Sequence, residues 1–247
     1  MSNVFVEETK LQDIADAIRE KNGTEETYKP AEMGDAVRAI ESGDNFYNEF
    51  WDAYQQEGER TSYDYCFYGY SWTEETVKPK YDICPTSAQS MFQNSKIVDI
   101  KKLFEDLGIK VDFSKATYIA NLFQGAKAQF VFPLDCSSLK SFEAVFRNNY
   151  DIKEVNILNL RSDCSISSTA FAQCKALETL NISGSLNSNL YLKESLLLSN
   201  ESIQNIINCM VDLTGGTAKI LTVHTDVKAK LTETQIAAIT SKNWTLA

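Results

Sequence analysis

The stretch AFAQCKALETLNI (170–182) decides the fold, because its pattern recurs three times earlier in the chain. Each copy begins with a phenylalanine in a short segment and continues into spaced apolar residues; the phenylalanines are Phe92, Phe123, Phe146 and Phe171. They lie 31, 23 and 25 residues apart, which is the range of leucine-rich repeats. A unit this short cannot bury its own apolar face, so neighbouring units must stack. The chain is therefore predicted to be α/β, with an irregular leucine-rich-repeat solenoid of short parallel strands over residues 86–192.

In each repeat the phenylalanine segment predicts a short helix or turn, and the spaced apolar residues predict a short strand. Apolar and polar residues alternate in 177–182, so Leu180 and Ile182 are expected to face inward. Solenoids usually bind rather than catalyse, which makes the outward side chains the candidate site. The outward residues of this strand and of 152–157 form the predicted ligand- or partner-binding face: Glu154, Asn156, Thr179 and Asn181.

Residues 193–247 predict a C-terminal α/β cap. Ser199 or Asn200 is expected to begin a helix that Gly215-Gly216 ends. A strand at 220–224, a helix that begins with the capping box Thr232-x-x-Gln235 and a last strand at 244–246 follow. This order implies parallel pairing that extends the solenoid sheet, with Trp244 covering the final repeat. One further helix, around Phe104, is predicted inside the repeats.

Residues 1–45 predict an N-terminal two-helix module for oligomerisation or attachment. Thr9-x-x-Gln12 is a capping box, and Pro30 fits the first turn of a second helix. Two helices this short are only marginally stable in isolation, so their apolar stripes need a partner to pack against. That partner is another copy of the chain, a neighbouring protein or the rest of this chain. The stripes consist of Leu11, Ile14, Ile18, Met33, Val37 and Ile40.

Residues 46–85 are rich in aromatic side chains and are predicted to form an N-terminal cap on the repeats. Aromatic rings offer large contact faces at low entropic cost, so the segment is also a candidate platform for a sugar or a protein. Burial against the first repeat is the alternative. The residues considered for this second patch, where exposed, are Tyr63, Tyr65, Tyr68, Tyr70 and Trp72.

The composition excludes several classes of partner. The formal charge of −10 over 247 residues argues against nucleic acid, whose phosphates need a basic surface. The same charge disfavours anionic membranes and wall polymers as electrostatically steered partners. Neither a secretory signal nor an apolar run long enough for membrane insertion is visible, so folding in a cytoplasm is expected. Neutral sugars and protein surfaces remain open as ligands.

The sequence does not predict an enzyme, a cofactor or a metal site. The single histidine, His224, is placed inside a strand with a structural role, and no nucleophile elbow, phosphate loop or dinucleotide fingerprint is present. The six cysteines contain no Cys-x-x-Cys pair, so buried reduced thiols are expected. Carboxylate pairs near the aromatics keep a cell-wall hydrolase open as an alternative: Glu57 with Glu59, and Glu74 with Glu75.

Three segments resemble parts of phage proteins. LQDIADAIREKNGTEETYKPAEMGDAVRAIESG (11–43) resembles a helical module of tail and tail-fibre-associated proteins from bacteriophages and prophages of Gram-positive hosts. FWDAYQQEGERTSYDYCFYGYSWTEETVKPKYDICPTSAQSMFQNS (50–95) is similar to the segment that follows that module. LTGGTAKILTVHTDVKAKLTETQIAAITSKNWTLA (213–247) is similar to the ending of such proteins, and the repeats resemble the BspA-like branch of leucine-rich repeats.

The resemblance implies a structural role in the virion tail or baseplate, with assembly in the cytoplasm of the bacterial host. It implies other tail or baseplate proteins, or a second copy, as partners of residues 1–43, and a host-surface protein or glycan as a further partner. The chain is too short for a long fibre, which implies a compact tip or decoration. A bacterial surface leucine-rich-repeat adhesin is the alternative.

Overall fold

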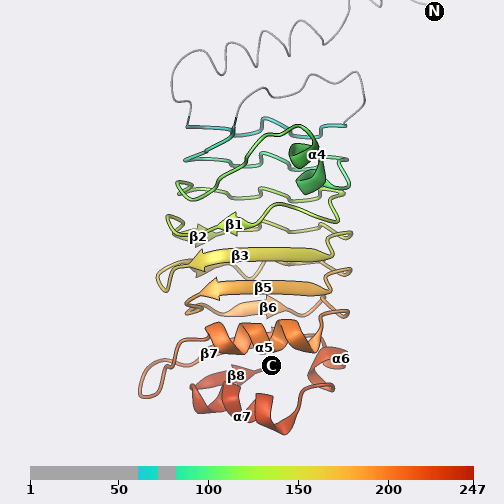
Figure 1. Ribbon diagram of the computed structural model, residues 1–247. Coiled ribbons are helices and arrows are strands. Elements are labelled where there is room, and N and C mark those ends of the chain that lie inside the picture. Colours follow the sequence, from blue (N-terminus) through green and yellow to red (C-terminus); the bar gives the residue numbers. More distant parts are fainter. Residues whose placement is uncertain (1–60, 72–81) are drawn as a thin grey trace, which may run out of the picture. The chain divides into compact units, whose positions relative to one another are not determined.

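The computed structural model describes residues 61–71 and 82–247, which form a mixed α/β arrangement of short parallel strands and few helices (Figure 1). Every strand pair among these residues is parallel, and their sheets do not close into a barrel. The elements in chain order are α4 (Ile100–Asp106), β1 (Leu134–Asp135), β2 (Ser141–Phe142), β3 (Glu154–Leu160), β4 (Ser165–Ile166), β5 (Thr179–Gly184), β6 (Leu190–Leu192), α5 (Asn200–Cys209), β7 (Lys219–Val223), α6 (Thr225–Lys228), α7 (Glu233–Ser241) and β8 (Trp244–Leu246).

The strands of successive repeats pair in register. The three sheets have the orders β1-β3-β5, β2-β4 and β6-β7-β8. In the first sheet Val155 lies opposite Leu180 and Ile157 opposite Ile182, and all four side chains are buried. This confirms the predicted alternation of inward apolar and outward polar side chains. The long β3 and β5 arrows lie side by side in Figure 1.

The phenylalanine segments are turns, as predicted, and each bonds to the next. The N–H of Phe92, for example, donates to the carbonyl of Leu122 at 2.8 Å. The rings form a buried stack, with centroids 5.4 Å apart for Phe92 and Phe123, 5.4 Å for Phe123 and Phe146, and 5.6 Å for Phe146 and Phe171.

Phe67 adds a fifth member to this stack, which the sequence pattern did not reveal. Its N–H donates to the carbonyl of Met91 at 2.8 Å, and its ring stacks on Phe92 with a centroid distance of 4.9 Å. The residues two positions before and after it, Tyr65 and Gly69, have φ values of 61° and 67°. The same positions around Phe92 also have positive φ, so both segments make the same turn.

The extra helix predicted around Phe104 is α4. The Asp99 side chain caps its first turn, and the buried Phe104 ring lies edge-on to Phe92 at 6.0 Å. The helix occupies the longest spacing between phenylalanines. After this helix the chain forms a single parallel bridge, between Val111 and Ile83.

Helix α5 begins where predicted, because Ser199 accepts a hydrogen bond from the backbone of its first turn. The prediction that Gly215-Gly216 ends it is wrong, since the last helical residue is Cys209. Met210 has extended backbone angles and forms a parallel bridge with Leu186. Pairing with an earlier segment therefore ends the helix before the glycines.

The prediction that the C-terminal strands extend the repeat sheet is also wrong. Two side chains of α5 occupy the open edge of β5: Ser202 Oγ accepts from the N–H of Leu180 at 3.0 Å, and Asn205 Oδ1 accepts from that of Ile182 at 2.6 Å. Because these donors are already used, no further strand pairs there, and β6, β7 and β8 form a separate sheet.

The remaining C-terminal predictions are mostly confirmed. The capping box of Thr232 and Gln235 begins α7, and Trp244 is buried, with its indole Nε1–H donating to the carbonyl of Val211 at 2.9 Å. His224 is not inside a strand as predicted. It follows β7 and caps α6, where its Nδ1 accepts from the N–H of Asp226 at 3.2 Å. None of the described helices is long and apolar enough to cross a membrane.

Candidate functional site

The polar side chains predicted as a binding face lie on β3 and β5, and hydrogen bonds join three of the four. Glu154 lies opposite Thr179, and Asn156 lies opposite Asn181. Asn156 Nδ2 donates to Glu154 Oε1 at 2.7 Å, and Asn181 Nδ2 donates to Asn156 Oδ1 at 2.9 Å. We call Glu154, Asn156, Thr179 and Asn181 the polar row. These bonds fix the amide orientations, so the row presents ordered acceptors and donors rather than free rotors.

A bulge in β3 ends the polar row. The strand register shifts between Ile157 and Leu160, and Asn159 has a φ of 54°. Its side-chain amide donates to Asp135 Oδ2 at 2.9 Å, and its N–H is bonded to Ser183 Oγ at 3.0 Å. The bulge therefore adds a further set of ordered polar groups at this end of the face.

A cavity of about 230 Å³ lies at the other end of the polar row, beside α4. Glu154 belongs to both, and Phe130, Asp99 and Glu105 also line the cavity. Of the lining cations, Lys102 is directed to Asp106, with Nζ 2.7 Å from Oδ2. The lining thus combines a half-buried aromatic ring with carboxylate acceptors, a combination that suits a small neutral ligand rich in hydroxyl groups.

Sequence reasoning missed the residues of this cavity other than Glu154. Parallel bridges join Asp99 to Phe130 and Phe130 to Glu154, so the three occupy the same position in successive repeats. Alignment of the repeats on their strands, rather than on their phenylalanines, would have revealed Asp99 and Phe130. Glu105 and the lysines come from α4, which no other repeat contains.

The predicted aromatic patch divides into buried and exposed members. Tyr63 is only 5% exposed, and burial raises its pKa, so it is not one of the exposed members of the patch. Tyr70 is half-buried. Tyr65 and Tyr68 are 52% and 50% exposed, with ring centroids 6.0 Å apart, and they remain candidates. Trp72 lies outside the described residues.

The thiols do not suggest redox chemistry. The described cysteines are free, and burial raises the pKa of Cys136, Cys164 and Cys174, for Cys164 to about 11. Because nucleophilic thiols need a depressed pKa, these three act as small apolar side chains. The prediction of burial is wrong for Cys84, which is exposed.

In the part of the chain that the structure describes, no cluster of three or more histidine, cysteine, aspartate and glutamate residues could hold a metal ion. The carboxylates considered for a hydrolase, Glu57, Glu59, Glu74 and Glu75, lie outside the described residues. So do the apolar stripes of residues 1–45. Comparison with family models, curated proteins and solved structures finds no match for the chain.

Proposed function

We propose that this chain is a non-enzymatic structural protein of a phage or prophage tail or baseplate, built on an irregular leucine-rich-repeat solenoid. The polar row would bind a host-surface or virion partner, and residues 1–43 would join the protein to its own copies or to other tail proteins. The resemblance of 11–43, 50–95 and 213–247 to phage tail proteins motivates the context.

The observation that carries the solenoid is the phenylalanine stack. Five segments, from Phe67 to Phe171, contribute stacked rings, and backbone hydrogen bonds join each segment to the next. Parallel pairs link Asp99 to Phe130, Phe130 to Glu154 and Glu154 to Thr179. The segments that contain these residues therefore pair side by side in the order in which they occur along the chain. A stack of this kind offers an extended, rigid surface, which favours binding over catalysis.

The polar row supports a binding role because it is ordered without a partner. Asn156 and Asn181 are held by each other and by Glu154, so a ligand meets them without a further loss of side-chain freedom. The cavity beside α4 continues this surface from Glu154. A hydroxyl-rich glycan end and a polar protein loop both match such a surface.

Particles purified from a strain that carries the gene would test the tail context. We expect mass spectrometry to find the chain in the particles and immunogold labelling to place it at the tail. Its recovery only from the surface of bacterial cells would instead support the adhesin alternative.

A second experiment tests the polar row. The double variant Asn156→Ala and Asn181→Ala should lose adsorption to host cells or to the tail partner, while Asn200→Ala with Asn208→Ala on α5 should retain it. Equal adsorption of the two variants would exclude the polar row as the binding surface.

The attachment role of the N-terminal module is tested separately. Ile14→Asp with Val37→Asp places charges in both apolar stripes and should lower the mass measured by light scattering. An unchanged mass, with the protein still folded, would contradict self-association through these stripes.

A further inference from the structure

The negative charge of the chain is concentrated in its N-terminal quarter. Residues 1–60 contain 6 Lys and Arg against 15 Asp and Glu, a net charge of −9. This leaves 18 against 19, a net charge of −1, in residues 61–247. The whole-chain value of −10 therefore says little about the surface of the repeats.

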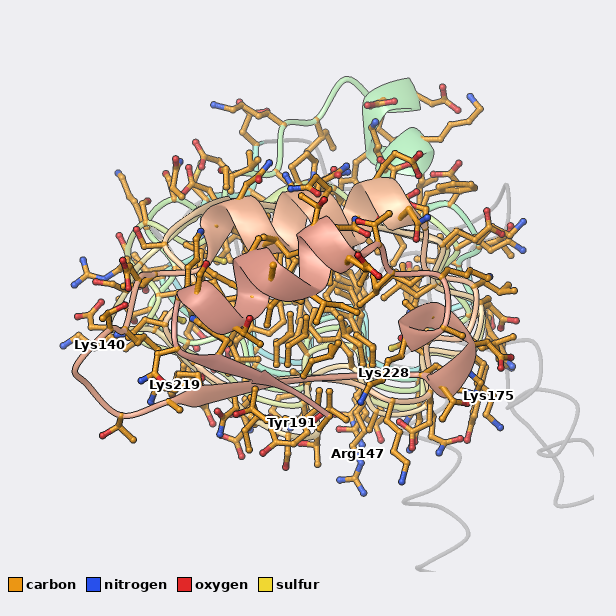
Figure 2. The ribbon with its side chains drawn as sticks, turned by 90° about the horizontal axis from the view of Figure 1, so that it is seen from below. Lys140, Arg147, Lys175, Tyr191, Lys219 and Lys228 are labelled. Atoms are coloured by element: carbon orange, nitrogen blue, oxygen red, sulfur yellow. The ribbon has the colours of Figure 1, made fainter. Side chains whose placement is uncertain are left out.

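The cations of the described residues fall into two groups. Five have a carboxylate within ion-pair distance: Lys101, Lys102, Lys110, Lys127 and Arg161. A second group has no described carboxylate within that distance. Figure 2 shows five of its members on one side of the molecule: Lys140, Arg147, Lys175, Lys219 and Lys228.

These five cations and Tyr191 make up what we call the basic face. In Figure 2 they lie along the side formed by β7 and β8, while α4 and α5 lie on the opposite side. Lys140 precedes β2, Lys219 begins β7, and Lys228 ends α6. Arg147 and Lys175 belong to two successive phenylalanine segments. The charge is therefore spread over several repeats rather than gathered at one point.

Carboxylates also lie on or beside these elements, and they offset part of the positive charge of the basic face. Glu194 is engaged by Gln173, whose backbone N–H and side-chain amide donate to it at 3.2 and 3.3 Å. Asp226 lies 3.6 Å from His224. Glu143, which follows β2, is the exposed carboxylate nearest in sequence to Lys140 and Arg147.

Hydroxyl side chains lie on the strands that carry or adjoin some of these cations. Tyr191 on β6 and Thr222 on β7 are opposite each other in register, and both are half-buried. Ser141 and Ser165 are paired in the same way on β2 and β4. Lysine ammonium groups act as point charges toward phosphate, and hydroxyl groups donate to phosphate oxygens without a fixed angle.

We propose that the basic face binds a linear polymer that carries repeated phosphate groups. The occupant follows from the distribution of charge. Separated cations on flexible stems match charges repeated along a chain, whereas a single small anion needs convergent donors in a pocket. The cavity beside α4 contains none of the five cations.

This second surface is independent of the polar row, which lies on β3 and β5. It revises the expectation that net charge disfavours anionic wall polymers, because that expectation assumed an even distribution of charge. Long-chain inorganic polyphosphate with a fluorescent end label is a suitable probe, and its binding to the full-length chain can be followed by fluorescence anisotropy.

Two variants with the same change in net charge provide the decisive comparison. The basic-face variant carries Lys140→Gln, Arg147→Gln and Lys219→Gln. The control carries Lys101→Gln, Lys102→Gln and Lys110→Gln, all of which are ion-paired in the wild type. We expect polyphosphate binding to weaken by about tenfold or more in the first and by less than about twofold in the second, as for screened surface charges.

Salt dependence provides a second readout. Each phosphate contact on a single strand contributes about 0.7 to the slope of log K against log salt, so loss of three contacts should make the slope shallower by about 2. Asn156→Ala with Asn181→Ala should leave polyphosphate binding unchanged. If the triple basic-face variant does not fold, Lys140→Gln with Lys219→Gln is used, with an expected slope change of about 1.4.

Three results would overturn the proposal. One is the absence of polyphosphate binding at low salt. Another is an equal loss of binding in the basic-face and control variants, which would show a response to net charge alone. The third is binding of polyglutamate or duplex DNA as tight as that of polyphosphate, which would show that the face does not select repeated phosphates.

Discussion

Phe67 lies flat on Phe92, with ring centroids 4.9 Å apart and ring planes inclined by 6°. This contact joins the aromatic-rich segment 61–71 to the repeats through the same interaction that joins the repeats to one another. Stacked aromatic pairs contribute about 0.5–1.5 kcal/mol beyond the apolar area that they bury. The stack therefore links five segments that are far apart in the sequence.

The first prediction concerns the centre of this stack. Phe123 contacts Phe92 on one side and Phe146 on the other, at 5.4 Å each, and is fully buried. Phe123→Ala should lower the free energy of unfolding by about 3–5 kcal/mol, because it removes two ring contacts and leaves a cavity. Denaturant titration measures this loss. Tyr118→Ala, at a 40% exposed ring outside the stack, should cost less than about 1 kcal/mol; similar losses would contradict the role of the stack.

The sequence predicted that the repeat units stack, but it identified a phenylalanine of the ring stack only where spaced apolar residues follow that phenylalanine. Phe92 to Phe171 were recognisable because spaced aliphatic or aromatic residues follow each of them. Phe67 was hidden, since four tyrosines between 63 and 70 give the segment an aromatic composition without a repeat pattern. The α5 boundary was missed for another reason. Met210 pairs with Leu186, and a contact between distant segments overrides the local helix-ending signal of two glycines.

The polar row was predictable, but the cavity beside α4 was not. Period-two alternation alone places Asn156 and Asn181 on one face, and the parallel register brings them together. The cavity requires α4 to lie beside Phe130 and Glu154, and the sequence pattern gives no position for an inserted helix. The basic face was not predicted, because the negative charge of residues 1–60 dominates the net charge of the whole chain.

The second prediction concerns the pH dependence of the polar row. Asn156→Asp places a carboxylate beside Glu154, whose Oε1 is 2.7 Å from the wild-type amide. Like charges this close should lower the free energy of unfolding by up to about 1 kcal/mol near pH 7. Mutual repulsion raises the pKa of the pair, so the loss is present above that pKa and disappears as one carboxyl is protonated in acid.

Denaturant titration from pH 3 to pH 8 measures this effect. Asn156→Ala is the matched control, because it removes the same hydrogen bonds without adding a charge, so the difference between Asn156→Asp and Asn156→Ala isolates the effect of the added carboxylate. A pH-independent loss in Asn156→Asp would contradict the close approach of residues 154 and 156.

The third prediction concerns stability in alkali. Burial raises the pKa of Cys164 from 9.0 to about 11, and it also raises the pKa of Cys136 and Cys174. A thiol is neutral below its pKa, so the unfolded chain ionises first, near pH 9. The contribution of these thiols is therefore complete below pH 9 and is lost progressively as the pH rises through the folded-state pKa.

The free energy of unfolding should accordingly fall between about pH 9 and pH 11. Cys164→Ala should show a shallower fall over this range, measured by denaturant titration at each pH. Cys84→Ala removes an exposed thiol and should keep the wild-type slope. Parallel slopes for all three proteins would contradict burial of Cys164.

The fourth prediction tests the bulge at the end of the polar row through two glycines with left-handed backbone. Gly184, at the end of β5, has a φ of 106°, and a Cβ added there would overlap the backbone nitrogen and carbonyl oxygen of Leu160. Gly108, after α4, has a φ of 67° with open space around the added atom. Both substitutions to alanine incur the left-handed penalty of about 1–2 kcal/mol.

In Gly184→Ala alone, the backbone of the neighbouring strand must also shift to make room for the added Cβ. This shift should add about 1–3 kcal/mol to the loss of unfolding free energy, as in overpacked cores. We therefore expect Gly184→Ala to lower the free energy of unfolding by clearly more than Gly108→Ala does. Because Leu160 lies at the register shift of β3, the strain should also disturb Asn159 and its bond to Asp135. Amide exchange at 158–160 should rise in Gly184→Ala and stay at the wild-type rate in Gly108→Ala; equal effects of the two substitutions would contradict the close approach of β3 and β5 at the bulge.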